Sequence, residues 1–145
     1  MRYYLDAEYN GFGGALISLA LAPEDHGAPF YAALPCPDPT PWVAAHVLPV
    51  LHIAPVSREA LGRGLAAYLA NDPDPVLVAD WPEDIAHAAT ALIAGPGRRH
   101  PIAPIRFELC DPPGFDAAAA SAVPHNALED AIALRAFMLA RGGCG

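Results

Sequence analysis

The hydrophobic pattern of the chain changes its period after residue 34, and this change limits the possible folds more than any other feature. Before it, three short apolar runs over 2–7, 15–22 and 29–34 are separated only by turns. Runs of this length with turn residues between them predict three strands that pair as an antiparallel meander. After residue 34, stretches with helical spacing appear between the strand-like runs, so the second half of the chain does not continue the meander.

The second half of the chain alternates between predicted helices and predicted strands. We expect helices over 42–51, 57–70, 82–94 and 127–140, strands over 76–79 and 102–110, and a loop over 111–123. The run Val76–Ala79 is continuously apolar, which is typical of a buried parallel strand. A meander followed by alternating elements predicts an α/β fold, with a mixed sheet of antiparallel and parallel strands flanked by helices. The length fits one domain over 1–145, in which we expect Trp42 and Trp81 in or near the core.

Two carboxylates stand near the end of the first predicted strand. Asp6 and Glu8 are two residues apart, so in a strand their side chains point to the same face of the sheet. Neighbouring carboxylates in apolar surroundings repel each other, and a bridging divalent cation makes such a pair tolerable. The alternative is that the strand ends at Ala7 and that both acids are solvated.

A second acidic segment follows the predicted strand at 76–79. Ligand and catalytic groups in open α/β sheets gather at such strand ends. Asp80 and Glu83 have the spacing of a helix N-cap and its capping-box partner, which gives both a structural role. Asp84 lies one turn inside the predicted helix and has no such role, so it is the candidate functional acid of this segment.

The third segment precedes the last predicted helix. Asn126 is a good N-cap residue, and Glu129 has the capping-box position. His125 therefore lies just outside the helix, in a loop that is able to move, while Asp130 is held in the first turn. Nothing local explains Asp130, so His125 and Asp130 form a further candidate site.

These separate segments could build one oxygen-rich site. Brought together by the fold, Asp6, Glu8, Asp84 and Asp130 would suit Mg²⁺ or Mn²⁺. Two such ions roughly 3.5–4 Å apart clamp the attacking and leaving oxygens of a phosphodiester. A nearby histidine, here His125, can take a proton from the attacking water. The pattern therefore indicates metal-dependent hydrolysis of a phosphodiester.

The three acidic segments resemble the motifs of the DEDDh 3′–5′ exonucleases, a family with an RNase H-like fold. The segment Asp6–Gly11 (DAEYNG) is similar to the family's DxExTG, with Asn10 in place of Thr, and His125–Asp130 (HNALED) matches HxAxxD. The middle motif, NxxxD, aligns Asp80 with the Asn and Asp84 with the acid. Because Asp80 is itself acidic, it competes with Asp84 for the second-motif role, and we favour Asp84. The order and spacing of the motifs agree along essentially the whole chain.

The resemblance implies roles for the acids and the histidine. Asp6, Glu8, Asp84 and Asp130 would hold two divalent metal ions, Mg²⁺ or Mn²⁺, and His125 would act as the general base. The fold would be an RNase H-like mixed sheet, with a three-strand antiparallel meander and further parallel strands. Two divalent ions would also halve the net charge of −8, which is otherwise unfavourable for a protein that binds nucleic acid.

Five further residues are candidates for contact with the substrate. Gly11 allows close backbone approach to a terminal nucleotide, Phe12 can stack on its base, and Asn10 lies beside them. Arg98 and Arg99, in the loop before the last predicted strand, are the best candidates for phosphate contact. The alternative for these two arginines is a solvated loop tip.

The function implied is a 3′–5′ exonuclease that releases nucleoside 5′-monophosphates from single-stranded or overhanging 3′ ends. The chain looks most like the small bacterial exoribonucleases of the family, so we expect RNA rather than DNA as the substrate. Two alternatives stay open: a catalytically silent RNase H-like module that binds nucleic acid or protein, and an enzyme of the same chemistry that clears very short oligonucleotides. The sequence does not fix the oligomeric state, although a homodimer would give so small a domain more surface for a strand.

The expected location follows from the cysteines and the apolar runs. Cys36, Cys110 and Cys144 are odd in number and include no CxxC pair, which argues against a disulfide framework; Cys36 and Cys110 are expected to be packed thiols. No signal peptide is visible after Met1, and no run approaches the roughly 20 apolar residues that span a bilayer. We therefore expect a cytoplasmic protein with no membrane contact.

Overall fold

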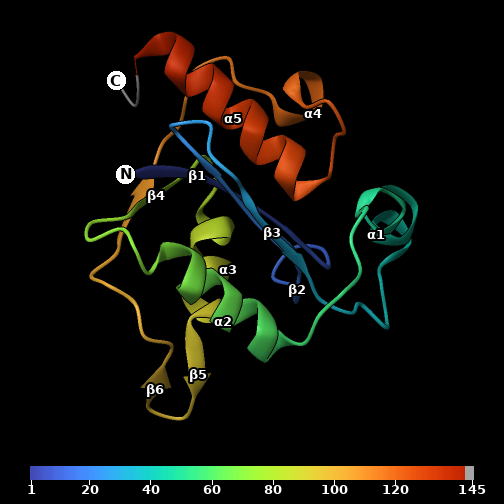
Figure 1. Ribbon diagram of the computed structural model, residues 1–145. Coiled ribbons are helices and arrows are strands. Elements are labelled where there is room, and N and C mark those ends of the chain that lie inside the picture. Colours follow the sequence, from blue (N-terminus) through green and yellow to red (C-terminus); the bar gives the residue numbers. More distant parts are fainter. Residues whose placement is uncertain (143–145) are drawn as a thin grey trace.

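The computed structural model describes residues 1–142, and its centre is a five-stranded mixed sheet (Figure 1). The strands of this sheet are β1 (Arg2–Tyr9), β2 (Leu16–Pro23), β3 (Phe30–Ala33), β4 (Val76–Ala79) and β7 (Arg106–Leu109). Their order in space is β3-β2-β1-β4-β7. The first three strands pair antiparallel, β4 runs parallel to β1, and β7 runs parallel to β4. The predicted α/β fold with an antiparallel meander and parallel strands is therefore confirmed.

Helices cover both faces of the sheet (Figure 1). They are α1 (Pro41–His46), α2 (Arg58–Leu69), α3 (Pro82–Ala91), α4 (Ala117–Ala120) and α5 (Ala127–Arg141), with a 3-10 turn, η1 (Leu48–Val50). Helices α2 and α3 pack in one hydrophobic cluster with one face of the sheet, and α5 packs in a second cluster with the other face. The sheet is thus buried on both sides, which explains why all eight residues of β2 are buried.

The alternation of β1 decides which side of the sheet carries the acids. Tyr3 and Leu5 belong to the cluster with α2 and α3, whereas Tyr4 belongs to the cluster with α5. Side chains two residues apart in a strand share a face, so Asp6 and Glu8 lie on the α5 side. The strand continues to Tyr9, so the alternative in which it ends before Glu8 is wrong.

The largest difference from the predicted elements lies between residues 92 and 105. The helix expected over 82–94 ends at Ala91, and the chain then forms a separate antiparallel hairpin of β5 (Ile93–Gly95) and β6 (Arg98–Arg99). Gly97 makes the turn with a φ of 65°, a left-handed conformation that glycine adopts without strain. The strand expected over 102–110 is shorter, Arg106–Leu109, because the prolines that precede it lack the backbone N–H that pairs strands.

Two smaller corrections concern the predicted loop and the cysteines. The loop expected over 111–123 contains the short helix α4, whose N-cap Asp116 accepts a hydrogen bond from the Ala118 N–H. Cys36 is a free thiol, but Cys110 is disulfide-bonded, so its interpretation as a packed thiol is wrong. Cys144 lies outside the described residues. Within residues 1–142, no helix is long and apolar enough to cross a membrane.

Candidate metal centre

The first two acids lie on β1, the central strand of the sheet. Asp6 carries one oxygen, Oδ2, that is buried and has no hydrogen-bond partner within residues 1–142. Burial, reinforced by the charges of Asp84 and Glu8, raises the pKa of Asp6 well above its usual range. Burial and the charge of Asp130 likewise raise the pKa of Glu8 to about 7. These two carboxylates therefore resist ionisation until a counter-charge is present.

The second acidic segment lies where β4 ends and α3 begins, and its caps differ from the prediction. The N-cap of α3 is Trp81, with extended backbone and no side-chain cap, so Asp80 does not cap the helix. Glu83 does not complete a capping box with Asp80 but instead accepts a hydrogen bond of 2.8 Å from the Gly13 N–H. Asp80 is thus free of the structural role that the sequence suggested, and its carboxylate is available to the site.

Asp6, Asp80 and Asp84 form the first group of candidate ligands. Each offers an oxygen, and these oxygens lie within 4.8 Å of one another. Asp84 is only 3% exposed, and burial together with the charges of Asp80 and Glu8 raises its pKa to about 8. Asp80 and Asp84, the two acids that compete for the middle motif, therefore both lie beside Asp6, and both belong to the site.

The start of α5 is fixed by Asn126, as predicted. Its Oδ1 accepts hydrogen bonds from the N–H groups of Leu128 and Glu129, at 3.0 and 3.2 Å. Its Nδ2 donates to the carbonyl oxygen of Val50 at 2.7 Å, at the end of η1. One buried side chain therefore caps α5 and ties it to the segment that follows α1.

Glu8, His125 and Asp130 form the second group of candidate ligands, with their ligand atoms also within 4.8 Å of one another. His125 has a φ of 67°, a left-handed conformation that is uncommon for a residue with a side chain. Its N–H donates to Asp130 Oδ2 at 3.1 Å, while Asp130 Oδ1 is buried without a partner in the described chain. Burial raises the pKa of Asp130. The strained turn before α5 thus brings the histidine to the acids.

Two residues of α1 that the sequence did not assign to the site contact His125. The ring of Trp42 meets the ring of His125 edge-on, with centroids 4.9 Å apart, and stacks on His46 at 4.8 Å. Val43 of the same helix packs with Ile17 in a small core at the end of the sheet, which holds α1 in place. Trp42 and His46 are four residues apart on one helix face, but no local signal indicates that this face meets the start of α5.

A cavity of about 410 Å³ opens over the first group, and we call it the acidic pocket. Its lining combines carboxylates with aromatic rings: Asp6, Ala7, Glu8, Tyr9, Gly11, Phe12, Trp42, Asp80, Trp81 and Asp84. Phe12 is 98% exposed, and Trp42 and Trp81 are about half exposed, so the expectation that both tryptophans lie in or near the core is wrong. Large exposed rings of this kind offer flat apolar faces on which another planar group can stack.

Asn10, predicted to contact substrate, has both ends of its amide occupied within the protein. Its Oδ1 accepts from the Thr40 N–H at 2.8 Å, and its Nδ2 donates to the carbonyl oxygen of Asp38 at 2.9 Å. Asn10 thereby fastens the glycine-containing loop after β1 to the segment that leads into α1. Gly11 in this loop has a φ of 77°, a left-handed backbone conformation that glycine adopts without strain.

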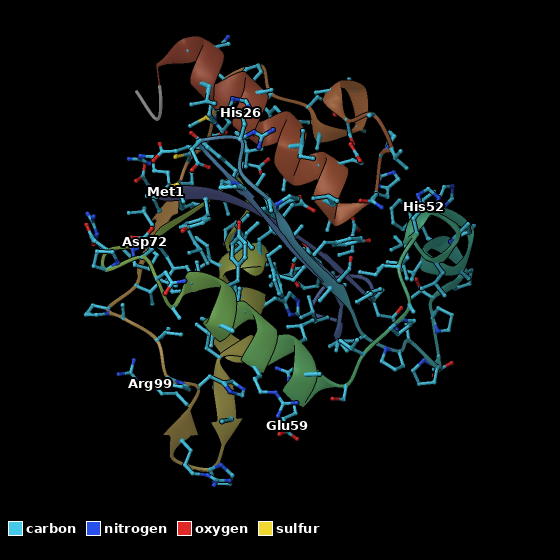
Figure 2. The ribbon with its side chains drawn as sticks, in the orientation of Figure 1. Met1, His26, His52, Glu59, Asp72 and Arg99 are labelled. Atoms are coloured by element: carbon cyan, nitrogen blue, oxygen red, sulfur yellow. The ribbon has the colours of Figure 1, made fainter. Side chains whose placement is uncertain are left out.

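Arg98 and Arg99 do not lie at the acidic pocket. They are exposed on the β5–β6 hairpin and line a different cavity of about 340 Å³, together with Glu59, Arg63 and His100. Figure 2 shows Arg99 at the hairpin end of the molecule, near Glu59, whereas His52 marks the region of α1 on another side. No residue lines both cavities. The solvated loop tip is therefore the better description of these arginines.

Comparisons with known proteins give no match: no family model, no curated protein and no solved structure matches this chain.

The donor set fits divalent metal ions. All candidate ligands except His125 are carboxylates, which Mg²⁺ and Mn²⁺ prefer. Two of the carboxylate oxygens, on Asp6 and Asp130, are buried without partners, which is costly unless a cation or a bound molecule satisfies them. The two ligand groups could therefore hold a metal ion each.

Proposed function

We propose that this protein is a metal-dependent 3′–5′ exonuclease of the DEDDh type, with an RNase H-like fold, that releases nucleoside 5′-monophosphates. One observation carries the proposal: two groups of ligand atoms, one from Asp6, Asp80 and Asp84 and one from Glu8, His125 and Asp130, lie beside an aromatic pocket. Their carboxylates come from three separate segments, in the chain order of the DEDDh motifs. The strand order, with the first acids on a central strand, is compatible with the RNase H-like fold.

The acids divide between two metal ions. Asp6 and Asp84, with Asp80 beside them, would hold one ion, and Glu8 with Asp130 would hold the other. When bound, two divalent ions polarise the phosphate and stabilise the charge that develops on the attacking and leaving oxygens. The raised pKa values of these carboxyl groups mean that metal binding releases protons, so binding strengthens as the pH rises.

His125 would accept the proton of the attacking water through its imidazole ring. Its position outside α5 leaves the ring half-buried, in contact with Trp42 and within reach of Glu8 and Asp130. Trp42 limits the orientations that this ring can take. With five carboxylates available to the metals, the histidine is free to act as the base rather than as a ligand.

The aromatic rings of the acidic pocket would hold the terminal base. Phe12, in the loop after β1, and Trp42, on α1, both line this cavity, and a flat base held between them would bury apolar surface on both sides. The backbone at Gly11 lies in the same lining, where no side chain obstructs a sugar or phosphate.

The test is digestion of matched RNA and DNA strands of two and twenty nucleotides, labelled at the 5′ end, with Mn²⁺, Mg²⁺ or EDTA. We expect the labelled strand to shorten stepwise from its 3′ end, with unlabelled nucleoside 5′-monophosphate as the second product, and neither result in EDTA or in an Asp84→Ala variant. RNA is the expected preference. Failure to cleave either sugar at either length, with every metal, would overturn the proposal and favour a catalytically silent RNase H-like binding module.

A further inference from the structure

The loop over 10–14, between β1 and β2, brings the ring of Phe12 to the acidic pocket, and we call it the pocket loop. Phe12 is 98% exposed, so packing of its side chain against the described residues does little to hold the ring. Gly11 lines the same pocket from the same loop. The placement of both residues therefore depends on how the backbone of the loop is held.

The pocket loop is closed by its own backbone. The N–H of Gly14 donates to the carbonyl oxygen of Gly11 at 2.8 Å. The N–H of Asn10 donates to the carbonyl oxygen of Ala15 at 2.9 Å. A Cβ on Gly14 would lie 2.1 Å from the carbonyl oxygen of Asn10, so a larger residue does not fit without a backbone shift. The loop is thus a compact unit, which a contact at one end can orient as a whole.

Side chains bind this unit near both of its ends. Asn10 holds the first end to the segment before α1 through its amide. Near the other end, Glu83 Oε1 accepts a hydrogen bond of 2.8 Å from the Gly13 N–H. Glu83 and Asp84 are consecutive residues in the first turn of α3. The bond therefore joins the loop that carries Phe12 to the turn that carries a candidate metal ligand.

A ring contact strengthens the connection between α3 and the strand that enters the loop. Tyr9, the last residue of β1, stacks on His87 with ring centroids 4.9 Å apart, and His87 lies one turn after Glu83 on α3. Burial, together with the charges of Asp84 and Glu83, raises the pKa of Tyr9, because these carboxylates lie near its hydroxyl. The end of β1 and Gly13 therefore both contact the first two turns of α3.

Resting on the proposed function, we propose that Glu83 is a positioning residue, whose bond to the Gly13 N–H sets the pocket loop so that Phe12 stacks on the terminal base. Glu83 does not line the acidic pocket, so it acts on the substrate only through the loop. Losing the bond should weaken the binding of the base and raise KM. It should leave kcat nearly unchanged, because the carboxylates and His125 stay in place.

Two variants separate the hydrogen bond of Glu83 from its charge. Glu83→Gln removes the charge but keeps an oxygen that can accept from the Gly13 N–H. Glu83→Asp keeps the charge but is one methylene shorter, so its carboxylate does not reach this donor. The matched control is Glu59→Asp, because Glu59 also lies in the first turn of its helix, α2. Its partner is the exposed Arg63, at 3.4 Å.

Steady-state kinetics on the twenty-nucleotide RNA with Mn²⁺ gives the first readout. We expect Glu83→Asp to raise KM by about tenfold, the equivalent of one lost stacking contact, with kcat within twofold of the wild type. Glu83→Gln and Glu59→Asp should keep KM within threefold. A lower kcat at unchanged KM in Glu83→Asp, or an equal rise of KM in Glu83→Gln, would overturn the proposal and leave the exonuclease assignment standing. Hydrolysis of no strand by the wild type would overturn both.

Phe12→Ala tests whether Glu83 acts through the ring. Without the ring, most of what the loop contributes to binding is already lost, so the effects of Phe12→Ala and Glu83→Asp should not add. We expect Glu83→Asp to raise KM by less than threefold in the Phe12→Ala background. A tenfold rise in that background would contradict an action through Phe12.

Amide hydrogen exchange measured by NMR follows the loop without turnover. Gly13 lies in an exposed loop, so protection of its N–H from exchange depends on the bond to Glu83. We expect this amide to exchange at least tenfold faster in Glu83→Asp than in the wild type, Glu83→Gln and Glu59→Asp. Equal exchange rates in all four proteins would show that Glu83 does not hold the loop.

Discussion

The acidic pocket and the β5–β6 hairpin each gather side chains of one charge, but the structure holds them by very different means. In and beside the pocket, carboxylates from β1, the start of α3 and the start of α5 have pKa values raised by burial and include oxygens without partners in the described chain. On the hairpin, Arg98 and Arg99 are exposed, at the rim of a cavity that also holds the acid Glu59. Burying the acids side by side lowers the stability of the fold, whereas the exposed arginines have almost no effect on stability.

This difference separates a candidate site from a surface feature. A fold that buries like charges without a counter-ion loses stability, so such a cluster is maintained only if something supplies the opposite charge. Exposed charges on a hairpin need no such explanation, because water screens them. The predictions that follow test this contrast, beginning with the largest expected effect.

Replacing one buried acid should abolish hydrolysis, whereas replacing an acid near the hairpin should not. Asp84→Asn keeps the size of the side chain but removes a metal ligand, and we expect kcat/KM to fall by about 10³-fold, or roughly 4 kcal/mol of transition-state stabilisation. Glu59→Gln, an exposed acid that lines the hairpin cavity, serves as the control and should stay within twofold. More than a tenth of the wild-type kcat/KM in Asp84→Asn would contradict the role of this residue.

The metal-free protein should be more stable in mild acid than in base. The pKa of Asp84 is raised to about 8 and that of Glu8 to about 7, above their values of about 4 in the unfolded chain. The folded state therefore binds more protons between these limits, and stability decreases as the pH rises from about 4 to about 8.

Thermal unfolding in EDTA checks this sign. We expect Tm at pH 5.5 to exceed Tm at pH 8.5 by about 5 °C or more, and Mn²⁺ to restore Tm at the higher pH. Asp84→Asn, which cannot ionise, should show a smaller pH dependence and a higher Tm than the wild type at pH 8.5 in EDTA. A wild-type Tm that increases with pH in EDTA would contradict the repulsion among these acids.

The cap that anchors the pocket should matter more than the cap of a helix beside the hairpin. Asn126→Ala removes the cap of α5 and the bond to Val50, and we expect a loss of about 2–3 kcal/mol in unfolding free energy and a lower kcat/KM. Ser57 caps α2 at an exposed position, where its Oγ accepts a hydrogen bond from the Ala60 N–H. Ser57→Ala should therefore lower the unfolding free energy by about 1 kcal/mol and leave kcat/KM unchanged. Chemical denaturation gives the loss of unfolding free energy, and steady-state kinetics gives the loss of kcat/KM. If both losses were equal in the two variants, the cap of α5 would have no special role at the site.

The smallest effect is expected at the hairpin itself. Arg98→Ala combined with Arg99→Ala removes two exposed cations that lie outside the acidic pocket, so kcat/KM on the two-nucleotide RNA should change by less than twofold. Unfolding free energy should change by less than about 1 kcal/mol, as for most exposed substitutions. A tenfold loss of kcat/KM would mean that the substrate reaches the hairpin.

The features predictable from the sequence are those set by local rules. The alternation of β1 placed Asp6 and Glu8 on one face, and the capping preference of Asn126 fixed the start of α5; both are confirmed. The features that were missed depend on tertiary contacts. Asn10 is occupied by Thr40 and Asp38 some thirty residues away, and no local pattern encodes that distance.

The middle motif, Asp80–Asp84, contains both a feature that local spacing predicts and one that depends on tertiary contacts. The spacing of Asp80 and Glu83 is typical of a capping box, yet Glu83 bonds to Gly13 in a distant loop and leaves Asp80 for the site. The rings of Trp42 and His46 contact His125 only because α1 packs on the end of the sheet, next to α5. Sequence reasoning found most of the acids, and the packing of α1 decides what surrounds the histidine.

Diffraction from crystals soaked with Mn²⁺ and a nucleoside 5′-monophosphate tests the central claim most directly, because the anomalous signal of manganese locates each ion. The account predicts two manganese peaks, one among Asp6, Asp80 and Asp84 and one between Glu8 and Asp130, with the phosphate of the ligand between the two ions. A crystal that binds no manganese at either group, or only at other surface carboxylates, would contradict it.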